Sequence, residues 1–234
     1  MAIILYDLCG AEDRRISPYC WRTKLALAHK GLPYEARPVR FGEIETIAPG
    51  PRRTLPTVED DGRLITDSGA IADHLEDAYP DRPSLFGGEA GRALTRFVQG
   101  WVEGVVHAGM ITMVVKDIHD HLDPADQDYF RRSREQRFGR PLEEAQAGRE
   151  ERLEAFRRSL APLRRTLEMQ PFLGGEAPLY ADYVALAAFL WARAISPFRL
   201  LADDDPVAAW LRRGLDLHDG LARRTPGYSW PAAA

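Results

Sequence analysis

Apolar and polar positions follow two different rhythms along the chain, and the change comes near residue 80. Residues 2–8 (AIILYDL) are almost entirely apolar, which is typical of a central strand buried on both faces. Residues 34–39 (YEARPV) predict a second strand. Pro38 places that strand at a sheet edge, because proline has no N–H to donate to a neighbour.

Two helices and a hairpin complete this first part. Ser17 and Pro18 suit the N-cap and first turn of a helix, and Gly31 suits its end. Residues 55–67 (LPTVEDDGRLITD) predict two strands joined at Asp-Gly, a strong hairpin signal, before a helix over 68–80. The order β-α-β, then β-β-α predicts a small α/β domain over residues 1–80.

Beyond a Pro- and Gly-rich linker at 81–91, the apolar spacing becomes helical. Residues 182–195 (DYVALAAFLWARAI) are apolar nearly all round and predict a buried central helix. The periodic run 153–167 contains Pro162, so it is either kinked or made of two pieces. We expect an all-α domain over residues 92–234.

Residues 117–150 do not fit either rhythm. They are long, charged and weakly periodic, and five arginines fall within ten residues: Arg131, Arg132, Arg134, Arg137 and Arg140. The pattern favours a solvated surface excursion of mixed charge. No spacing within it supports a specific site for an anionic ligand.

Composition and charge argue against several kinds of binding partner. The net charge of −4 argues against nucleic acid or an anionic membrane as a partner. We find no apolar run of the length that spans a bilayer. The two cysteines provide no disulfide framework, and His119 and His121 lack the spacing of metal ligands. We therefore expect a cytosolic protein that binds neither metal, membrane nor nucleic acid.

Four short motifs occur in an order that resembles the glutathione transferases. Residues 17–20 (SPYC) resemble the glutaredoxin-type Cys-Pro-Tyr-Cys with serine in the leading position. Leu55-Pro56 resembles the family's cis-proline, Asp67-Ser68 its acidic-serine pair, and Asp182 its structural aspartate. The resemblance covers essentially the whole chain. It implies a thioredoxin-like N-terminal domain, an all-α C-terminal domain that contributes the hydrophobic substrate site, and a homodimer.

Longer stretches are similar to the bacterial glutathione-dependent β-etherases that cleave lignin model compounds, and to their fungal relatives. They include SPYCWRTKLALAHKG, YPDRPSLF, DYFRRSRE and ADYVALAAFLWA. This similarity implies that glutathione displaces a phenolate from a carbon beside a ketone. The chain ends soon after PGYSWPAAA, without the longer tail of some β-etherases.

The resemblance assigns roles to specific residues. Ser17 would stabilise the glutathione thiolate at a helix N-terminus, and Leu55 would offer its backbone groups to the cysteinyl part. Asp67 and Ser68 would hold the γ-glutamyl end. Because Thr54 stands where relatives keep Lys, Arg or Gln, Arg53 would reach the glycine carboxylate.

An apolar, aromatic second substrate would lie between the domains. The candidates for its site, from helical face and position, are Tyr19, Trp101, His107, Met110 and Trp191. Ordinary core packing is the alternative for each of them.

Two other functions stay open. One is a non-catalytic glutathione- or ligand-binding protein of the same fold, in which Ser17 only caps its helix. The other is a glutathione-linked thiol transferase that uses Cys20, which otherwise is a small packing residue. Leu179 stands where the family has a capping side chain, so a weaker start is expected for the helix that contains Asp182.

Overall fold

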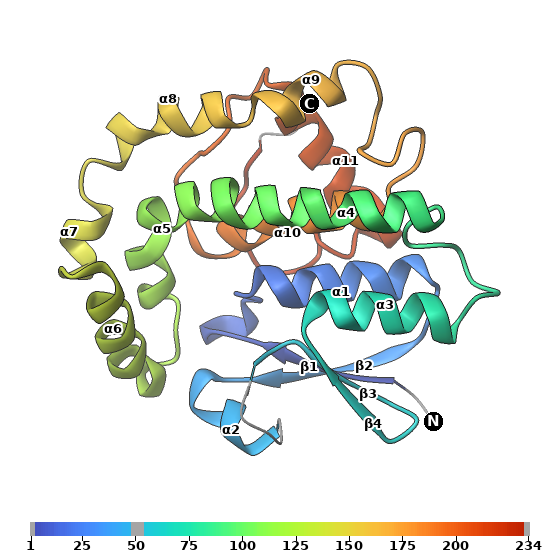
Figure 1. Ribbon diagram of the computed structural model, residues 1–234. Helices are drawn as coiled ribbons and strands as arrows, with labels where there is room; N and C mark the ends of the chain where they lie inside the picture. Colours follow the sequence, from blue (N-terminus) through green and yellow to red (C-terminus); the bar gives the residue numbers. More distant parts are fainter. Residues whose placement is uncertain (1–2, 48–53, 232–234) are drawn as a thin grey trace.

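The computed structural model describes residues 3–47 and 54–231. A four-stranded sheet in the order β2-β1-β3-β4 forms one side of the molecule (Figure 1). Its strands are β1 (Ile3–Leu8), β2 (Tyr34–Val39), β3 (Thr57–Asp60) and β4 (Arg63–Thr66). β1 runs parallel to β2 and antiparallel to β3. The predicted central position of the first strand is therefore confirmed.

The two special positions of the sheet also behave as predicted. Pro38 lies in the edge strand β2, opposite Asp7 of β1. The hairpin between β3 and β4 turns at Asp61 and Gly62, whose φ angles of 51° and 79° are both left-handed. Two successive positive φ angles give the turn a twist that matches the strands.

The remaining elements of the first part lie beside this sheet. They are η1 (Ala11–Asp13), α1 (Pro18–His29), η2 (Phe41–Glu43), α2 (Ile44–Ile47) and α3 (Ser68–Ala78). α1 and α3 lie between the sheet and the helical part of the chain (Figure 1). α1 also packs directly on α10, so the two parts share one hydrophobic core.

The second part is helical throughout. Its elements are α4 (Glu89–Trp101), η3 (Val102–His107), α5 (Ala108–Asp120), α6 (Pro124–Phe138), α7 (Leu142–Gln146), α8 (Arg149–Ser159), α9 (Ala161–Leu167), α10 (Tyr180–Ile195) and α11 (Pro206–Gly220). The run with Pro162 is made of two pieces, because α8 ends at Ser159 and α9 begins at Ala161. α4 begins at Glu89, inside the stretch expected to be linker.

α10 is the predicted buried helix, with every residue except Ala181 and Arg193 buried. Its N-cap residue, Leu179, has no side chain that can cap the helix. The Asp182 carboxylate nevertheless accepts four N–H groups, at 2.7 to 3.1 Å, from Leu173, Gly174, Leu179 and the Trp210 indole. Four donors on one buried carboxylate fix the start of α10 without that cap.

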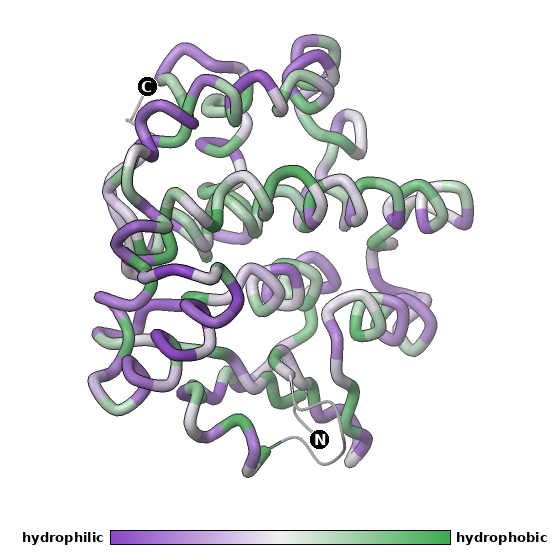
Figure 2. Tube along the Cα trace, turned by 60° about the vertical axis from the view of Figure 1, so that its left-hand side comes forward, coloured by the Kyte–Doolittle hydropathy of each residue, from purple (hydrophilic) through white to green (hydrophobic). Residues whose placement is uncertain are grey.

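α4, η3 and α5 form one continuous helix whose middle turn is a π-helix, Val102–His107. Hydrophobic and hydrophilic residues are mixed along it (Figure 2). By length and composition it is apolar enough to cross a membrane, contrary to the sequence-based expectation, and 33% of its most apolar window is buried. Core helices of globular proteins meet the same criterion, and all three segments contact α10.

The charged stretch 117–150 lies at the surface, as expected, but it is helical and docked on the rest of the protein. It completes α5 and forms α6 and α7, and α6 docks on the turn after β2. The Asp126 carboxylate accepts the backbone N–H groups of Phe41, at 3.2 Å, and Gly42, at 2.9 Å. Phe130 packs on Phe41 with ring centroids 5.8 Å apart. The buried face of α6 is short, which is why the sequence showed little periodicity.

Candidate active site

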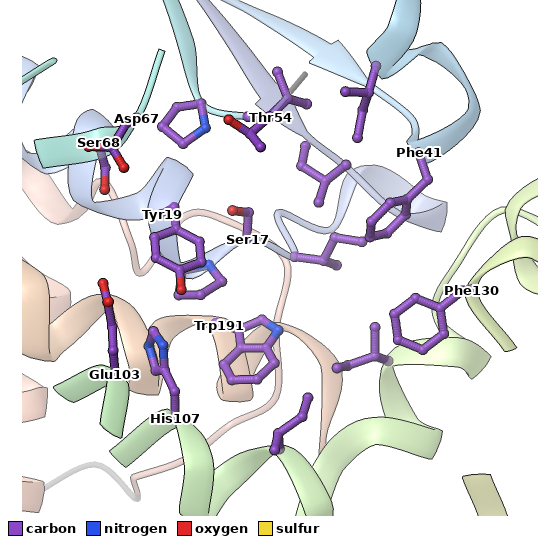
Figure 3. Close-up of a pocket in the computed structure, with 18 of the residues that line it drawn as sticks. Ser17, Tyr19, Phe41, Thr54, Asp67, Ser68, Glu103, His107, Phe130 and Trp191 are labelled. Atoms are coloured by element: carbon purple, nitrogen blue, oxygen red, sulfur yellow. The ribbon is translucent and has the colours of Figure 1, made fainter. Parts of the chain in front are cut away.

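A cavity of about 730 Å³ lies where the N-terminal ends of α1 and α3 face the helical part. Ser17 is at its centre (Figure 3). Asp67 and Ser68 lie to one side, Phe41 and Phe130 to the other, and Trp191 lies across from Ser17. The cavity is therefore enclosed by both parts of the chain.

Ser17 is the N-cap of α1 and is only 4% exposed. Its Oγ accepts the Cys20 backbone N–H at 3.2 Å, so the hydroxyl hydrogen stays available to donate. Pro18 has no N–H, and the Trp21 N–H is bonded to the Ser17 carbonyl. Within the described residues, the Tyr19 N–H is thus the free donor of this first turn. Two donors at a helix N-terminus favour an anion in front of them.

Asp67 and Ser68 form a similar corner at α3. Asp67 is the N-cap, and its Oδ1 accepts the N–H groups of Gly69 and Ala70 at 2.9 and 3.0 Å. Its φ of 76° is unusual for a residue with a side chain, a strain often stored at functional sites. The Ser68 Oγ is buried and has no hydrogen-bond partner among the described residues. Such a hydroxyl needs a partner, which a ligand in the cavity can supply.

The loop before β3 forms the third side. Leu55-Pro56 is a cis peptide, and both residues line the cavity together with Thr54. Arg53, assigned by resemblance to a carboxylate of glutathione, lies outside the described residues. The structure thus brings the residues of the three N-terminal motifs together around one cavity: Ser17, Leu55, Pro56, Asp67 and Ser68.

Three of the five candidates for the second substrate also line this cavity. Tyr19, His107 and Trp191 form a row of rings with centroids 5.8 Å apart and edge-to-face contacts. Burial and nearby Arg22 lower the pKa of His107 to about 3. Its Nε2 is buried and has no hydrogen-bond partner in the part of the chain that the structure describes. His107 is therefore a neutral ring at the cavity, and not the satisfied or exposed histidine that sequence favoured.

The other two candidates do not line the cavity. Met110 is completely buried in the core, and Trp101 packs at the core's edge. Trp101 directly precedes the π-turn, where an extra residue per turn shifts the helix face. A face extrapolated at 3.6 residues per turn is therefore wrong beyond that point. Besides His107, the residues Gln99, Glu103 and Ile111 belong to the side of this helix that lines the cavity.

Several further lining residues were missed from sequence. They come from η2, α2, α5 and α6: Phe41, Ile44, Ala108, Ile118, Phe130, Arg134 and Arg137. The arginine cluster was a signal, but the sequence did not show which of its members face inward. The docking of α6 on η2 decides it.

Cys20 is unsuited to redox chemistry here. It is 1% exposed and absent from the cavity lining, and its Sγ accepts the Leu8 N–H at 3.4 Å. Burial raises the pKa of the Cys20 thiol well above its usual range, so the reactive thiolate is disfavoured. Burial likewise raises the pKa of Cys9.

Comparison with known proteins agrees with this geometry. Residues 13–83 match the family model of the glutathione S-transferase N-terminal domain, and residues 93–213 that of the C-terminal domain. The chain is similar to the glutathione S-transferase-like protein ustS of Aspergillus flavus, with 27% identity over 73% of this chain and 72% of that protein.

Solved structures show the same fold along nearly the whole length. Glutathione transferase GSTFuA3 from Phanerochaete chrysosporium is 30% identical, with a TM-score of 0.74 over 94% of this chain and 92% of its own. CsGST63524 of Ceriporiopsis subvermispora, solved in complex with glutathione, is 27% identical, with a TM-score of 0.73 over 95% and 94%. The predicted fold class, a thioredoxin-like domain followed by an all-α domain, is confirmed. The chain belongs to the glutathione S-transferase family.

Proposed function

We propose that this protein activates glutathione as its thiolate and transfers it to an apolar, aromatic electrophile. The observation that carries the proposal is the Ser17 hydroxyl, whose acceptor side is occupied and whose hydrogen is free within the cavity. A free thiol has a pKa of about 8.5 and is mostly protonated at neutral pH. The Ser17 O–H and the Tyr19 N–H favour its anionic form, and the released proton passes to solvent.

The second corner of the cavity suits the γ-glutamyl end of glutathione. The unpaired Ser68 Oγ and the N-terminal end of α3 would bind its carboxylate. The Asp67 Oδ2 would accept the ammonium group of the γ-glutamyl residue, because the N–H groups of α3 bond to Oδ1. This leaves the thiol to reach Ser17.

The opposite wall suits an aromatic electrophile. Phe41, Phe130 and Trp191 supply apolar faces, and His107 stays uncharged at neutral pH. In the β-aryl ether version, the sulfur attacks the carbon beside a ketone, a C–S bond forms, and the C–O bond breaks. The phenolate leaves with the electron pair. This version is supported by the resemblance of four sequence stretches to β-etherases and by the aromatic wall.

A glutathione-dependence assay on wild type and Ser17→Ala tests the proposal. The panel combines β-aryl ether ketones with a generic chloroaromatic, and ultraviolet difference spectra measure the bound thiolate. We expect kcat to fall by about 100-fold or more, since one hydrogen-bond donor to a developing or bound anion is worth that much. Ser17→Thr, which keeps a capping hydroxyl, is the control.

Each outcome separates the alternatives. Glutathione binding without turnover of any electrophile supports the binding-protein function instead. Turnover of the chloroaromatic while every ether is refused removes only the etherase part. Unchanged activity in Ser17→Ala contradicts the role given to the serine.

We propose in addition that the protein is a homodimer. Leu94 and Phe97 on α4 are 68% and 77% exposed, which is unusual for adjacent large apolar side chains. Light scattering should give twice the chain mass, and Phe97→Glu should give a monomer. A monomeric wild type, or a wild type that partitions into vesicles through this helix, contradicts the proposal.

A further inference from the structure

Two guanidinium groups at one end of the cavity have no acidic partner. Arg134 and Arg137 of α6 both line it, three positions apart and thus on one helix face. Within residues 3–47 and 54–231, neither forms an ion pair. Arg131 of the same helix, by contrast, pairs with Glu135 and Glu143 at 2.9 Å each. Both arginines therefore line the cavity without the ion pairs that Arg131 forms, with Arg134 half-buried and Arg137 exposed to solvent.

Arg134 is held in place by its surroundings. Its guanidinium lies 4.8 Å from the centroid of the Phe130 ring and donates to the Ser133 hydroxyl at 3.0 Å. Burial, and then the charge of Arg137, lower the pKa of Arg134. A partly buried cation beside a like charge is costly unless an anion offsets it.

The two carboxylates that line the cavity, those of Asp67 and Glu103, each already accept hydrogen bonds within the protein. Glu103 accepts from buried Arg22 at 2.9 Å and from Gln99 at 3.2 Å. Asp67 accepts two helix N–H groups through Oδ1. Among the described lining residues, the arginines therefore both come from α6, and the carboxylates come from α3's N-cap and from η3.

We propose that the α6 end of the cavity binds a carboxylate on the electrophile, so that the substrate class is an aromatic electrophile that carries an anionic group. The inference rests on the proposed transferase function and adds the charge of its second substrate. The aromatic body would lie against Phe130 and Trp191, with the reacting carbon toward Ser17. The docking of Asp126 on the turn at Phe41 holds the two arginines in position.

A matched pair of electrophiles isolates the charge. In 4-chloro-3-nitrobenzoate and 4-chloro-3-nitrobenzamide, the thiolate sulfur bonds to the ring carbon that carries chlorine. The C–Cl bond breaks and chloride takes the electron pair, while the thiol proton goes to solvent. The carboxylate and the amide are unchanged by the reaction. They activate the ring differently, so the ratio of kcat/KM for acid over amide is compared between variants.

We expect Arg134→Gln to lower this ratio by about 10- to 100-fold, the worth of a charge-assisted hydrogen bond. Arg137→Gln should lower it by about 5-fold or less, because Arg137 is exposed and its charge is screened by solvent. KM for glutathione and kcat/KM for the amide should change less than about 2-fold. Arg132→Gln removes the same charge from an exposed position of α6 outside the cavity, and should change nothing. Arg134→Lys should restore part of the ratio, and melting temperatures check the fold.

Two kinetic results overturn the inference. Equal losses for acid and amide mean that the arginines act only on structure. A constant ratio with a raised KM for glutathione means that they bind glutathione itself.

If wild type converts neither compound, binding decides the inference, and the proposed function fails only if the β-aryl ether ketones of the panel are refused as well. The probes are then S-(4-carboxy-2-nitrophenyl)glutathione and its carboxamide, measured by calorimetry. A preference for the acid that Arg134→Gln abolishes supports the site, and equal affinities overturn it.

Discussion

The two walls of the cavity are built in different ways. On the sheet side, Ser17 and Asp67 are helix caps, and each side chain is oriented by a hydrogen bond to a backbone N–H two or three residues away. On the helical side, Phe130 and Trp191 come from helices about sixty positions apart and reach the cavity only through packing of α6 and α10 on other elements. The first wall can be altered one hydrogen bond at a time. The second depends on how whole helices dock.

Ser68 should show the largest difference between the two walls, because its hydroxyl is buried and has no hydrogen-bond partner among the residues that the structure describes. Ser68→Ala should weaken glutathione binding by about 10- to 100-fold, measured by calorimetry. The free energy of unfolding should be unchanged or rise by about 1 kcal/mol, since an unsatisfied group is removed.

Thr23 provides a matched control for that experiment. Its Oγ1 is also buried and has no hydrogen-bond partner among residues 3–47 and 54–231, but Thr23 lies outside the cavity. Thr23→Val should leave glutathione affinity unchanged. If both variants, or neither, weaken binding, the local assignment of the sheet-side wall is wrong.

A comparison of Trp191 with Trp101 tests the helical wall, because Trp191 lines the cavity and Trp101 does not. Trp191→Leu should lower kcat/KM for an aromatic electrophile by about 3- to 10-fold, because ring contacts are lost. Trp101→Leu should stay within about 2-fold, since Trp101 does not line the cavity. Glutathione affinity should be unchanged in both. A larger effect at Trp101 would mean that the π-turn does not set the helix face.

Asp126 tests whether docking of α6 maintains the second wall. Asp126→Asn weakens two charge-assisted bonds to the N–H groups of Phe41 and Gly42. We expect a loss of about 1 kcal/mol, hence a melting temperature about 2–4 °C lower, and a higher KM for the electrophile alone. Asp128→Asn makes the same charge change at an exposed position of α6. Equal effects of the two variants would show that net charge, not docking, is responsible.

Cys20 should give the smallest effect. Because its thiol is buried and outside the cavity, Cys20→Ala should keep conjugation within about 2-fold of wild type. A thiol transferase that uses Cys20 would lose its activity entirely in this variant. The assay is glutathione-dependent reduction of a mixed disulfide, run beside the conjugation assay.

Much of the fold followed from local patterns in the sequence. Short local patterns predict three of its elements: the apolar run of β1, the Asp61-Gly62 turn and the nearly all-apolar α10. The sheet-side wall was predictable for the same reason, because a capping residue must stand directly before its helix. Trp101 and Met110 were misplaced because a π-turn is not visible in a periodicity of 3.6.

The sequence by itself therefore determined the two-part architecture and the helix starts at Ser17 and at Asp67-Ser68. Both depend on interactions between residues that are close together in the chain. Only the tertiary structure decided which arginines of the charged stretch face inward and which aromatic rings they meet. The physical reason is that α6 has a short buried face. Its orientation is set by Asp126 and Phe130 against a turn some eighty-five residues earlier in the chain.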